Sequence, residues 1–206
     1  MALANSPTRA GARKTIAGFS VLELVLSFCV MLILTAVAIP SLMRSLRTYQ
    51  LNDAATRVAS MLKFARFEAV RRNKQINFLL QSSGPGWLAG TDSNNNSALD
   101  ATEKQDYIGG FASLLTAGAA PVPSAITASL GVASLQTLSG GNSSITFDAR
   151  GAVRPSIGAA VTGNVYVFYI GSANDPDPGY RAVILLPSGS TQIWTAPSGG
   201  PWERVG

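Results

Sequence analysis

The chain has 206 residues, of which 47% are hydrophobic and 13% charged, so it can bury a core and is not globally disordered. It contains no His, which excludes Ser-His-Asp and Cys-His catalysis and removes the commonest zinc ligand. A single cysteine, Cys29, excludes an intrachain disulfide and a zinc cluster of cysteines. We therefore predict a folded protein that is not an enzyme and that requires no cofactor.

The net charge of +5 is spread unevenly along the chain. Residues 43–74 carry eight basic and two acidic residues, a net charge of +6. Residues 75–206 carry five basic and eight acidic residues, a net charge of −3. The basic excess thus lies in one segment beside an apolar stretch. This pattern is typical of a membrane-proximal surface rather than of a nucleic-acid groove.

The N-terminal region combines a basic leader with an apolar span. Residues 1–18 are small and polar, with three basic residues and no acidic one, whereas 19–40 are almost wholly apolar and carry one charge, Glu23. If helical, these 22 residues span about 33 Å, close to the hydrocarbon thickness of a bilayer. The preceding basic residues predict a cytoplasmic N-terminus and an exported C-terminal region. A secretory signal would place its small residue after the apolar core, but Gly18 precedes it.

The pattern after Pro40 predicts an amphipathic helix. Apolar residues recur there at spacings of three and four. They are Met43, Leu46, Leu51, Ala54, Ala55, Val58, Met61, Leu62, Ala65 and Ala69. Only Pro40 interrupts 19–73, so we predict one helix of about 55 residues, or about 80 Å, whose segment 41–74 packs on a globular head. Pro40 should kink this helix because it removes a backbone donor.

Short runs rich in β-branched and aromatic residues predict strands throughout the head, residues 75–206. The expected strands are 75–80, 86–89, 144–148, 164–170, 180–186 and 191–195. Residues 109–143 are rich in Gly, Ala and Ser and predict a long connection, with a short strand near 130–138 as one option. A long N-terminal helix followed by such strands predicts an α+β fold, in which the helix packs on an antiparallel β-sheet.

The residues around Gly18 form a motif: Gly18 precedes Phe19-Ser-Val-Leu-Glu23, an apolar run and Pro40. This motif strongly resembles the processing site of the type IV pilin and pseudopilin family. The resemblance implies the type IV pilin fold, removal of leader 1–18 by a prepilin peptidase between Gly18 and Phe19, and N-methylation of Phe19. It also implies a single-pass protein of the bacterial inner membrane with a periplasmic head. Such a protein later joins other pilins in a pilus or pseudopilus through an inner-membrane assembly platform.

Glu23 is the residue to which we assign a role in assembly. An ionised carboxylate within lipid is costly and requires a partner. The free amine of Phe19 in one subunit is a suitable partner for Glu23 of the next, and this pairing would set the register of the filament. The alternative is that Glu23 reaches a lipid headgroup from near the membrane edge.

Two further segments narrow the family. Leu62–Arg72, followed by the strand at 76–80, and Ile145–Gly151 are similar to the GspH/FimT group of minor pilins and pseudopilins. The resemblance implies a minor pilin or pseudopilin, a structural subunit of a type IV pilus or of a type II protein secretion system. The alternative for the helix end is a solvated face on which Glu68 pairs with Arg72.

Two other functions remain as alternatives. Some FimT-type subunits bind DNA through a Gly-Arg-x-Arg turn, but the comparable turn here, Gly189–Gln192, lacks both arginines. Because phosphate binding needs clustered basic residues, DNA is not an expected partner. A membrane-tethered periplasmic enzyme is the other alternative, which the absence of His and of a nucleophile motif disfavours.

Residues 92–103 match the twelve-residue spacing of an EF-hand loop. The oxygen ligands would come from Asp92, Asn94, Asn96, the Ala98 carbonyl, Asp100 and Glu103. Ser97 stands where the sharp turn favours Gly, and Asn at two ligand positions lowers the charge. The spacing thus suggests a low-affinity calcium site, and the alternative is an Asn-rich hairpin loop with Asx turns.

Overall fold

The computed structural model describes residues 19–138 and 143–205. The chain forms two compact units that divide between Ser41 and Leu42. Helix α1 (Val21–Arg72) runs through this division, which confirms the single long helix that the sequence predicted. Pro40 lies inside α1 and does not end it; the kink stays a prediction. The predicted leader, 1–18, with the cleavage residue Gly18, lies outside the described residues.

The two parts of α1 differ in burial. Every residue from 19 to 46 is exposed, and by length and composition alone the helix could cross a membrane. From Leu51 onward one face is buried, as predicted. Its apolar members are Leu51, Ala54, Ala55, Val58, Ala59, Met61, Leu62, Ala65 and Ala69. Met43 and Leu46, predicted on this face, are 47% and 50% exposed because the sheets cover α1 only from Leu51.

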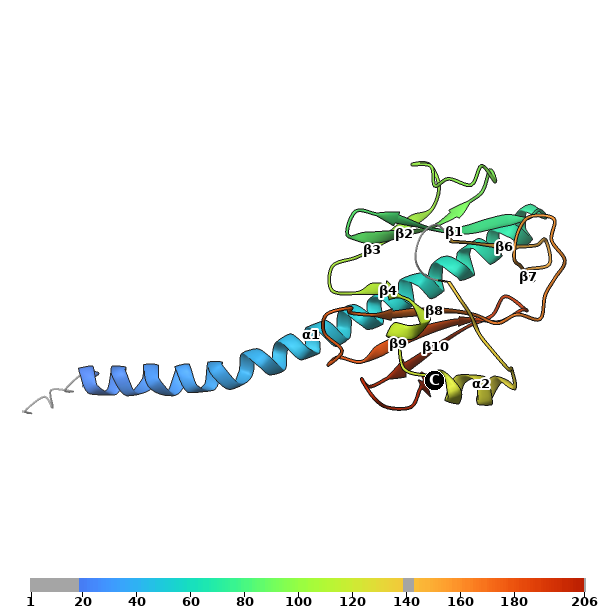
Figure 1. The fold of residues 1–206 in the computed structure, drawn as a ribbon. Coiled ribbons are helices and arrows are strands. Elements are labelled where there is room, and N and C mark those ends of the chain that lie inside the picture. The colour runs from blue at the N-terminus through green and yellow to red at the C-terminus, as the bar shows by residue number, and fades with distance from the viewer. Residues whose placement is uncertain (1–18, 139–142, 206) are drawn as a thin grey trace, which may run out of the picture. The chain divides into compact units, whose positions relative to one another are not determined.

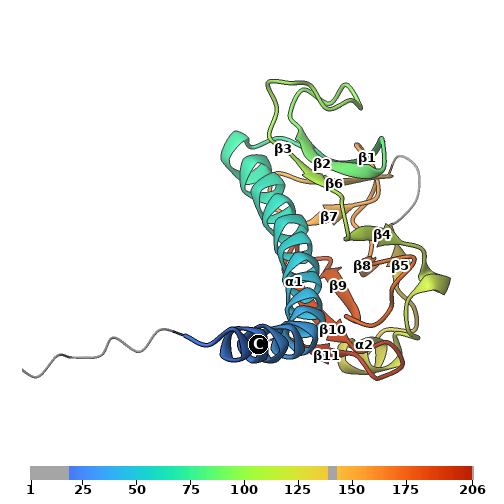
Figure 2. The same cartoon turned by 90° about the vertical axis from the view of Figure 1, so that its left-hand side faces the viewer.

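From here on the head is the second compact unit, 42–206, which adds part of α1 to residues 75–206. Its described strands form two sheets rather than the one sheet expected. The first has the order β3 (Gln105–Ile108), β2 (Gly86–Asp92), β1 (Ile76–Ser83), β6 (Ser143–Phe147) and β7 (Val153–Arg154). The second has the order β11 (Glu203–Arg204), β10 (Thr191–Ala196), β9 (Tyr180–Leu185), β8 (Tyr166–Gly171) and β4 (Ser113–Leu115). All these pairs are antiparallel, and β5 (Gln136–Thr137) adds a parallel pair with β8. The two sheets are seen in Figure 1, and Figure 2 shows the C-terminal part of α1 beside both.

The predicted connection 109–143 contains more structure than expected. It includes β4, a 3-10 turn, the short helix α2 (Ser124–Leu130) and β5. Helix α2 ends at Gly131, whose φ of 65° suits a left-handed cap. Ile126 of α2 is fully buried and belongs to a second apolar cluster, with Trp194 and Trp202. Seven residues make fewer than two helical turns, so their periodicity is too short to predict a helix.

Strand β8 shows how the core is divided. Its side chains Tyr166, Phe168 and Ile170 join the cluster that includes the buried face of α1, whereas Val167 and Tyr169 join the cluster of α2. Because strand side chains alternate between faces, the second sheet is apolar on both sides. The ring of Phe168 also meets Phe78 of β1 edge to face, with centroids 5.9 Å apart, which packs the two sheets against each other.

Polar contacts hold the first turns of α1 within the head. The loop between β8 and β9 contacts α1 through ion pairs of Arg44 with Asp177, 3.0 Å, and of Arg47 with Asp175. Arg181 of β9 is buried, and its Nε donates to Oδ1 of Asn52 at 2.6 Å. Burial lowers the pKa of Arg181. These contacts fix the helix where its apolar face is not yet covered.

Candidate functional site

The residues predicted for processing and assembly lie at the start of the described chain. Phe19 is 82% exposed, and Glu23 lies in the first turn of α1. The helix dipole stabilises a negative charge at this end of a helix. Ser27 donates from its Oγ to the Glu23 backbone carbonyl, 2.7 Å, and this bond does not involve the Glu23 carboxylate. Within 19–138 and 143–205, no basic side chain forms an ion pair with Glu23. A partner from another molecule is therefore compatible with the geometry.

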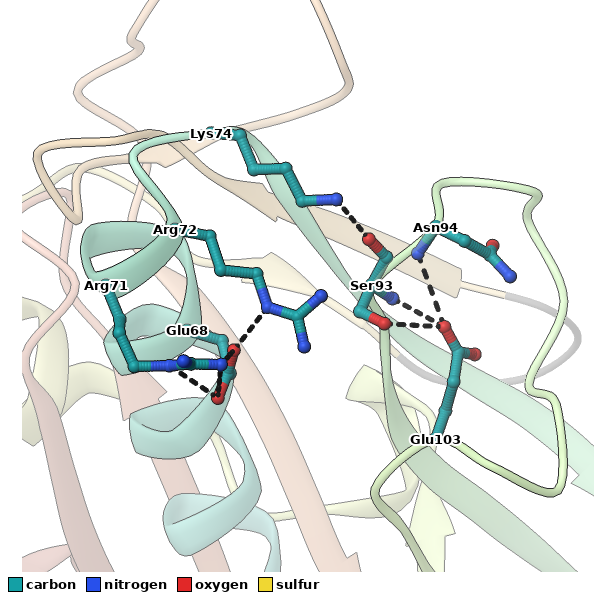
Figure 3. A network of polar contacts seen from close by, with 7 residues as sticks. All are labelled: Glu68, Arg71, Arg72, Lys74, Ser93, Asn94 and Glu103. Carbon is teal, nitrogen blue, oxygen red and sulfur yellow. Dashed lines mark hydrogen bonds and ion pairs between the residues drawn. The ribbon is translucent and has the colours of Figure 1, made fainter.

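The helix end, for which a solvated face was the alternative interpretation, is partly buried. Glu68 is 7% exposed and accepts hydrogen bonds from Arg71, at 2.7 Å from Nη2, and from Arg72, at 2.7 Å from Nε (Figure 3). The predicted Glu68–Arg72 pair is thus present, but the carboxylate is shared by two guanidinium groups. The hydrogen bonds from Arg71 lower the pKa of Glu68; burial opposes this effect, and Arg72 adds to it.

We expect the head to lose stability as the pH falls through the folded-state pKa of Glu68. That pKa lies below the ordinary value of 4.5, so the ion pairs stabilise the folded state above pH 4.5 and are lost as the carboxylate protonates. Glu68→Gln should reduce the stability of the head at neutral pH and make that stability less dependent on pH. Urea unfolding of the head from neutral pH to about pH 3 measures this. The control is Glu203→Gln, at an exposed position, and an equal acid dependence in Glu68→Gln and the natural head would contradict the prediction.

The calcium-like loop is closed by its own hydrogen bonds. Asp92 is fully buried and accepts the backbone N–H groups of Asn96, 3.2 Å, and Ser97, 2.9 Å. Glu103 accepts from Ser93 and Asn94 with one carboxylate oxygen (Figure 3), and from the N–H of Asp100 with the other. Asp100 accepts from the side-chain amides of Asn94, 2.8 Å, and Asn96, 3.0 Å. Each predicted carboxylate ligand thus receives hydrogen bonds from the loop itself.

The three carboxylates predicted as calcium ligands are all engaged in hydrogen bonds within the loop. Where the chain is described, no three His, Cys, Asp or Glu side chains are grouped to hold a metal ion. The side-chain amides of Asn94 and Asn96 donate to Asp100 in this arrangement. Ser97 has a φ of 66°, so the sharp turn forms without the Gly that EF-hands favour. Calcium binding stays a prediction from spacing alone.

We expect a chelator to leave the melting temperature of the head unchanged, because the loop is closed without metal. The prediction from the spacing is tested by adding millimolar calcium, which raises the melting temperature by mass action if it binds the folded loop. In that case Asp100→Asn should abolish the rise, whereas Asp177→Asn, outside the loop, should retain it. An unchanged melting temperature with calcium would leave the loop as a plain turn.

Arg66 connects the helix to two turns of the head. Its Nε donates to the carbonyl oxygen of Gly151 at 3.2 Å. A Cβ atom on Gly189 would lie 2.2 Å from that same oxygen and 2.7 Å from the Arg66 Nε. The N–H of Val153 donates to the carbonyl of Pro187, 2.9 Å, so the two turns are also bonded to each other. The structure thereby joins motif segments that lie far apart in the sequence, which spacing alone did not predict.

The turn after β6 is organised by Asp148. Its Oδ1 accepts the N–H groups of Arg150 and Ala152, both 2.9 Å, and its Oδ2 accepts from Arg154 at 3.0 Å. Burial alone would raise the pKa of Asp148, but the N–H of Ala152, the Arg154 guanidinium and the N–H of Arg150 outweigh burial and lower it. The family-like segment Ile145–Gly151 is thus a rigid turn that presents Arg150 to solvent.

The turn compared with the DNA-binding turn has a packing role. Gly189 is buried and has a φ of 81°, which only Gly adopts without strain. The turn carries no basic residue between Leu186 and Gln192. Its contacts with Gly151 and Arg66 therefore account for Gly189 without nucleic acid.

The whole arrangement defines a class of protein: a membrane-compatible apolar helix that continues into an α+β head built on two sheets. The family model described as type II transport protein GspH matches residues 54–195. This match spans more than half of the chain, so the chain belongs to the GspH family, and the resemblance to the GspH/FimT group is confirmed.

Two solved structures are similar in fold, both of the type IV minor pilin FimU from Pseudomonas aeruginosa strain PAO1. The crystal structure in space group P21 has 18% sequence identity and a TM-score of 0.46, and the match covers 73% of this chain and 90% of that one. The structure in space group P65 has 20% identity and a TM-score of 0.44, with 72% and 94% coverage. Among curated proteins, none matches the chain significantly.

Proposed function

We propose that this protein is a minor pilin or pseudopilin, a structural subunit of a type IV pilus or of a type II secretion pseudopilus. Membership of the GspH family supports the class. The observation that carries the proposal is the N-terminal part of α1, which is apolar on all sides and exposed at every residue. A helix of this kind requires a lipid or protein environment around its whole circumference.

The energetics explain why such a subunit would use two environments. Leu22, Leu26 and Leu32 are each more than 60% exposed, and full burial of one such side chain contributes about 1.5–3 kcal/mol. In the inner membrane, lipid chains would cover them. In a filament, the same surface would pack against the helices of neighbouring subunits. Transfer from lipid to filament then exchanges one apolar environment for another, and the polar groups decide the register.

Glu23 is the polar group that we assign to this step. It is the only ionisable carboxylate between Phe19 and Pro40, and it stands four residues from the N-terminus that cleavage after Gly18 would create. Prepilin peptidase would make the amine of Phe19 and methylate it, and the assembly platform would bring this amine to Glu23 of the next subunit. The ion pair would satisfy two charges that lipid solvates poorly.

Mass spectrometry of the subunit isolated from its host tests the proposal. We expect a mature chain that begins with N-methylated Phe19, and a different N-terminus would contradict it. Glu23→Ala should leave insertion and cleavage intact but should reduce recovery in sheared filaments by at least about tenfold, because the register pair is lost. Ser27→Ala, at a polar position one turn further along α1, is the control. Normal filament recovery with Glu23→Ala would exclude the register role.

A further inference from the structure

The outer face of α1 carries an isolated apolar site near its C-terminal end. Phe67 is 61% exposed and Val70 is 49% exposed, one turn apart on the same face. Together with Lys63, Arg66 and Arg150 they line a hollow of about 390 Å³. We call these five residues the basic-apolar patch.

The patch is separate from the apolar surface at the other end of α1. Between Leu46 and Phe67, the exposed positions of the helix are mostly polar. They include Asn52, Asp53, Thr56, Arg57, Ser60 and Lys63. Phe67 and Val70 are therefore not a continuation of the membrane-compatible stretch, and packing within the head does not explain their exposure.

The cations of the patch have no carboxylate partner within the described chain. The two neighbouring acids are already paired, Glu68 with Arg71 and Arg72, and Asp148 with Arg154. None of Lys63, Arg66 and Arg150 takes part in an ion pair among residues 19–138 and 143–205. The patch thus presents three uncompensated positive charges around two apolar side chains.

The side chain of Arg66 and the backbone of Arg150 are held in place before any partner binds. The Arg66 Nε is fixed on the carbonyl of Gly151, which leaves its terminal nitrogens free for a planar acceptor. Arg150 stands on the turn that Asp148 closes through backbone N–H groups. A partner that binds through Arg66 would therefore find this side chain already ordered, which favours affinity.

We propose that the basic-apolar patch docks the head of a neighbouring filament subunit, through a segment in which carboxylates flank an aliphatic or aromatic side chain. This inference rests on the function proposed above. The three cations would pair with the carboxylates of this segment, and Phe67 and Val70 would pack against the apolar side chain between those carboxylates. A nucleic acid fits less well, because it needs a track of basic residues, whereas this hollow is lined by three cations and two apolar side chains.

Photo-crosslinking in host cells tests the docking. Phe67 is replaced by the photoreactive benzoylphenylalanine in the full chain, and Val122, 79% exposed in the connection before α2, is replaced in the same way as a control. We expect position 67, but not position 122, to crosslink to another filament subunit. Crosslinks from position 67 only to lipid or nucleic acid, or none from subunits recovered in filaments, would overturn the inference.

Charge reversal supplies the second measurement. Lys63→Glu with Arg150→Glu, both at exposed positions, should reduce the crosslink by at least about tenfold and leave the melting temperature of the chain unchanged. Lys104→Glu with Arg204→Glu, also exposed and outside the patch, should retain it. An undiminished crosslink in the first variant would overturn the charge argument. If the natural subunit is absent from filaments altogether, the proposed function fails instead, so the two failures are distinguishable.

Discussion

Val58→Asp should unfold the head. Val58 is fully buried and belongs to the apolar cluster that α1 forms with Phe78 and Phe168 from the two sheets. The substitution loses the burial of an aliphatic side chain, about 1.5–3 kcal/mol, and places a carboxyl group in an apolar cluster. We expect a loss of more than about 4 kcal/mol, which is a large fraction of the stability of an ordinary domain.

Circular dichroism and urea unfolding of the head, produced as residues 42–206, measure this effect. The matched control is Ser60→Asp, which introduces the same side chain at an exposed position two residues along the same helix. It should change the stability by less than about 0.5 kcal/mol. A folded Val58→Asp head with stability close to that of Ser60→Asp would show that the packing of α1 on the sheets is not the main source of stability.

Gly189→Ala should strongly destabilise the head, although it adds only one methyl group. Gly189 has a φ of 81°, where an L-residue costs about 1–2 kcal/mol. The new Cβ would also lie 2.2 Å from the carbonyl oxygen of Gly151, a backbone atom that cannot move without opening the turn held by Arg66. Overpacking adds about 1–3 kcal/mol, so we expect a total loss of about 2–5 kcal/mol.

Two control glycines separate the cost of the backbone conformation from the cost of the close contact. Gly110 has a φ of 79° and open space around its Cβ position, so Gly110→Ala should show the backbone cost alone, about 1–2 kcal/mol. Gly199→Ala has neither a positive φ nor a close contact and should cost little. Thermal and urea unfolding of the three variant heads gives the order of their losses of stability. Equal losses of stability for Gly189→Ala and Gly110→Ala would mean that the two turns move apart at little cost in free energy.

The sequence was sufficient for the features that depend on local periodicity. The unbroken apolar and amphipathic pattern predicted α1 over its full length, and it predicted the burial of Leu51, Val58 and Leu62. Six strands, β1, β2, β6, β8, β9 and β10, were also predicted near their observed positions. Helical and strand periodicities are properties of adjacent residues, so they can be read before the chain is folded. The family resemblance rested on such local motifs as well, and the family match confirmed it.

Only the tertiary structure decided how these elements divide between two sheets and which polar residues meet. Strands of two to four residues, such as β3, β7 and β11, exist because a longer neighbour pairs with them, and their own residues carry too little pattern. Arg181 of β9 donates to Asn52 of α1, 129 residues away in the chain. Gly189 matters because it meets Gly151 and Arg66 from distant parts of the chain. Contacts of this kind depend on the distance between residues in space, and sequence separation does not specify that distance.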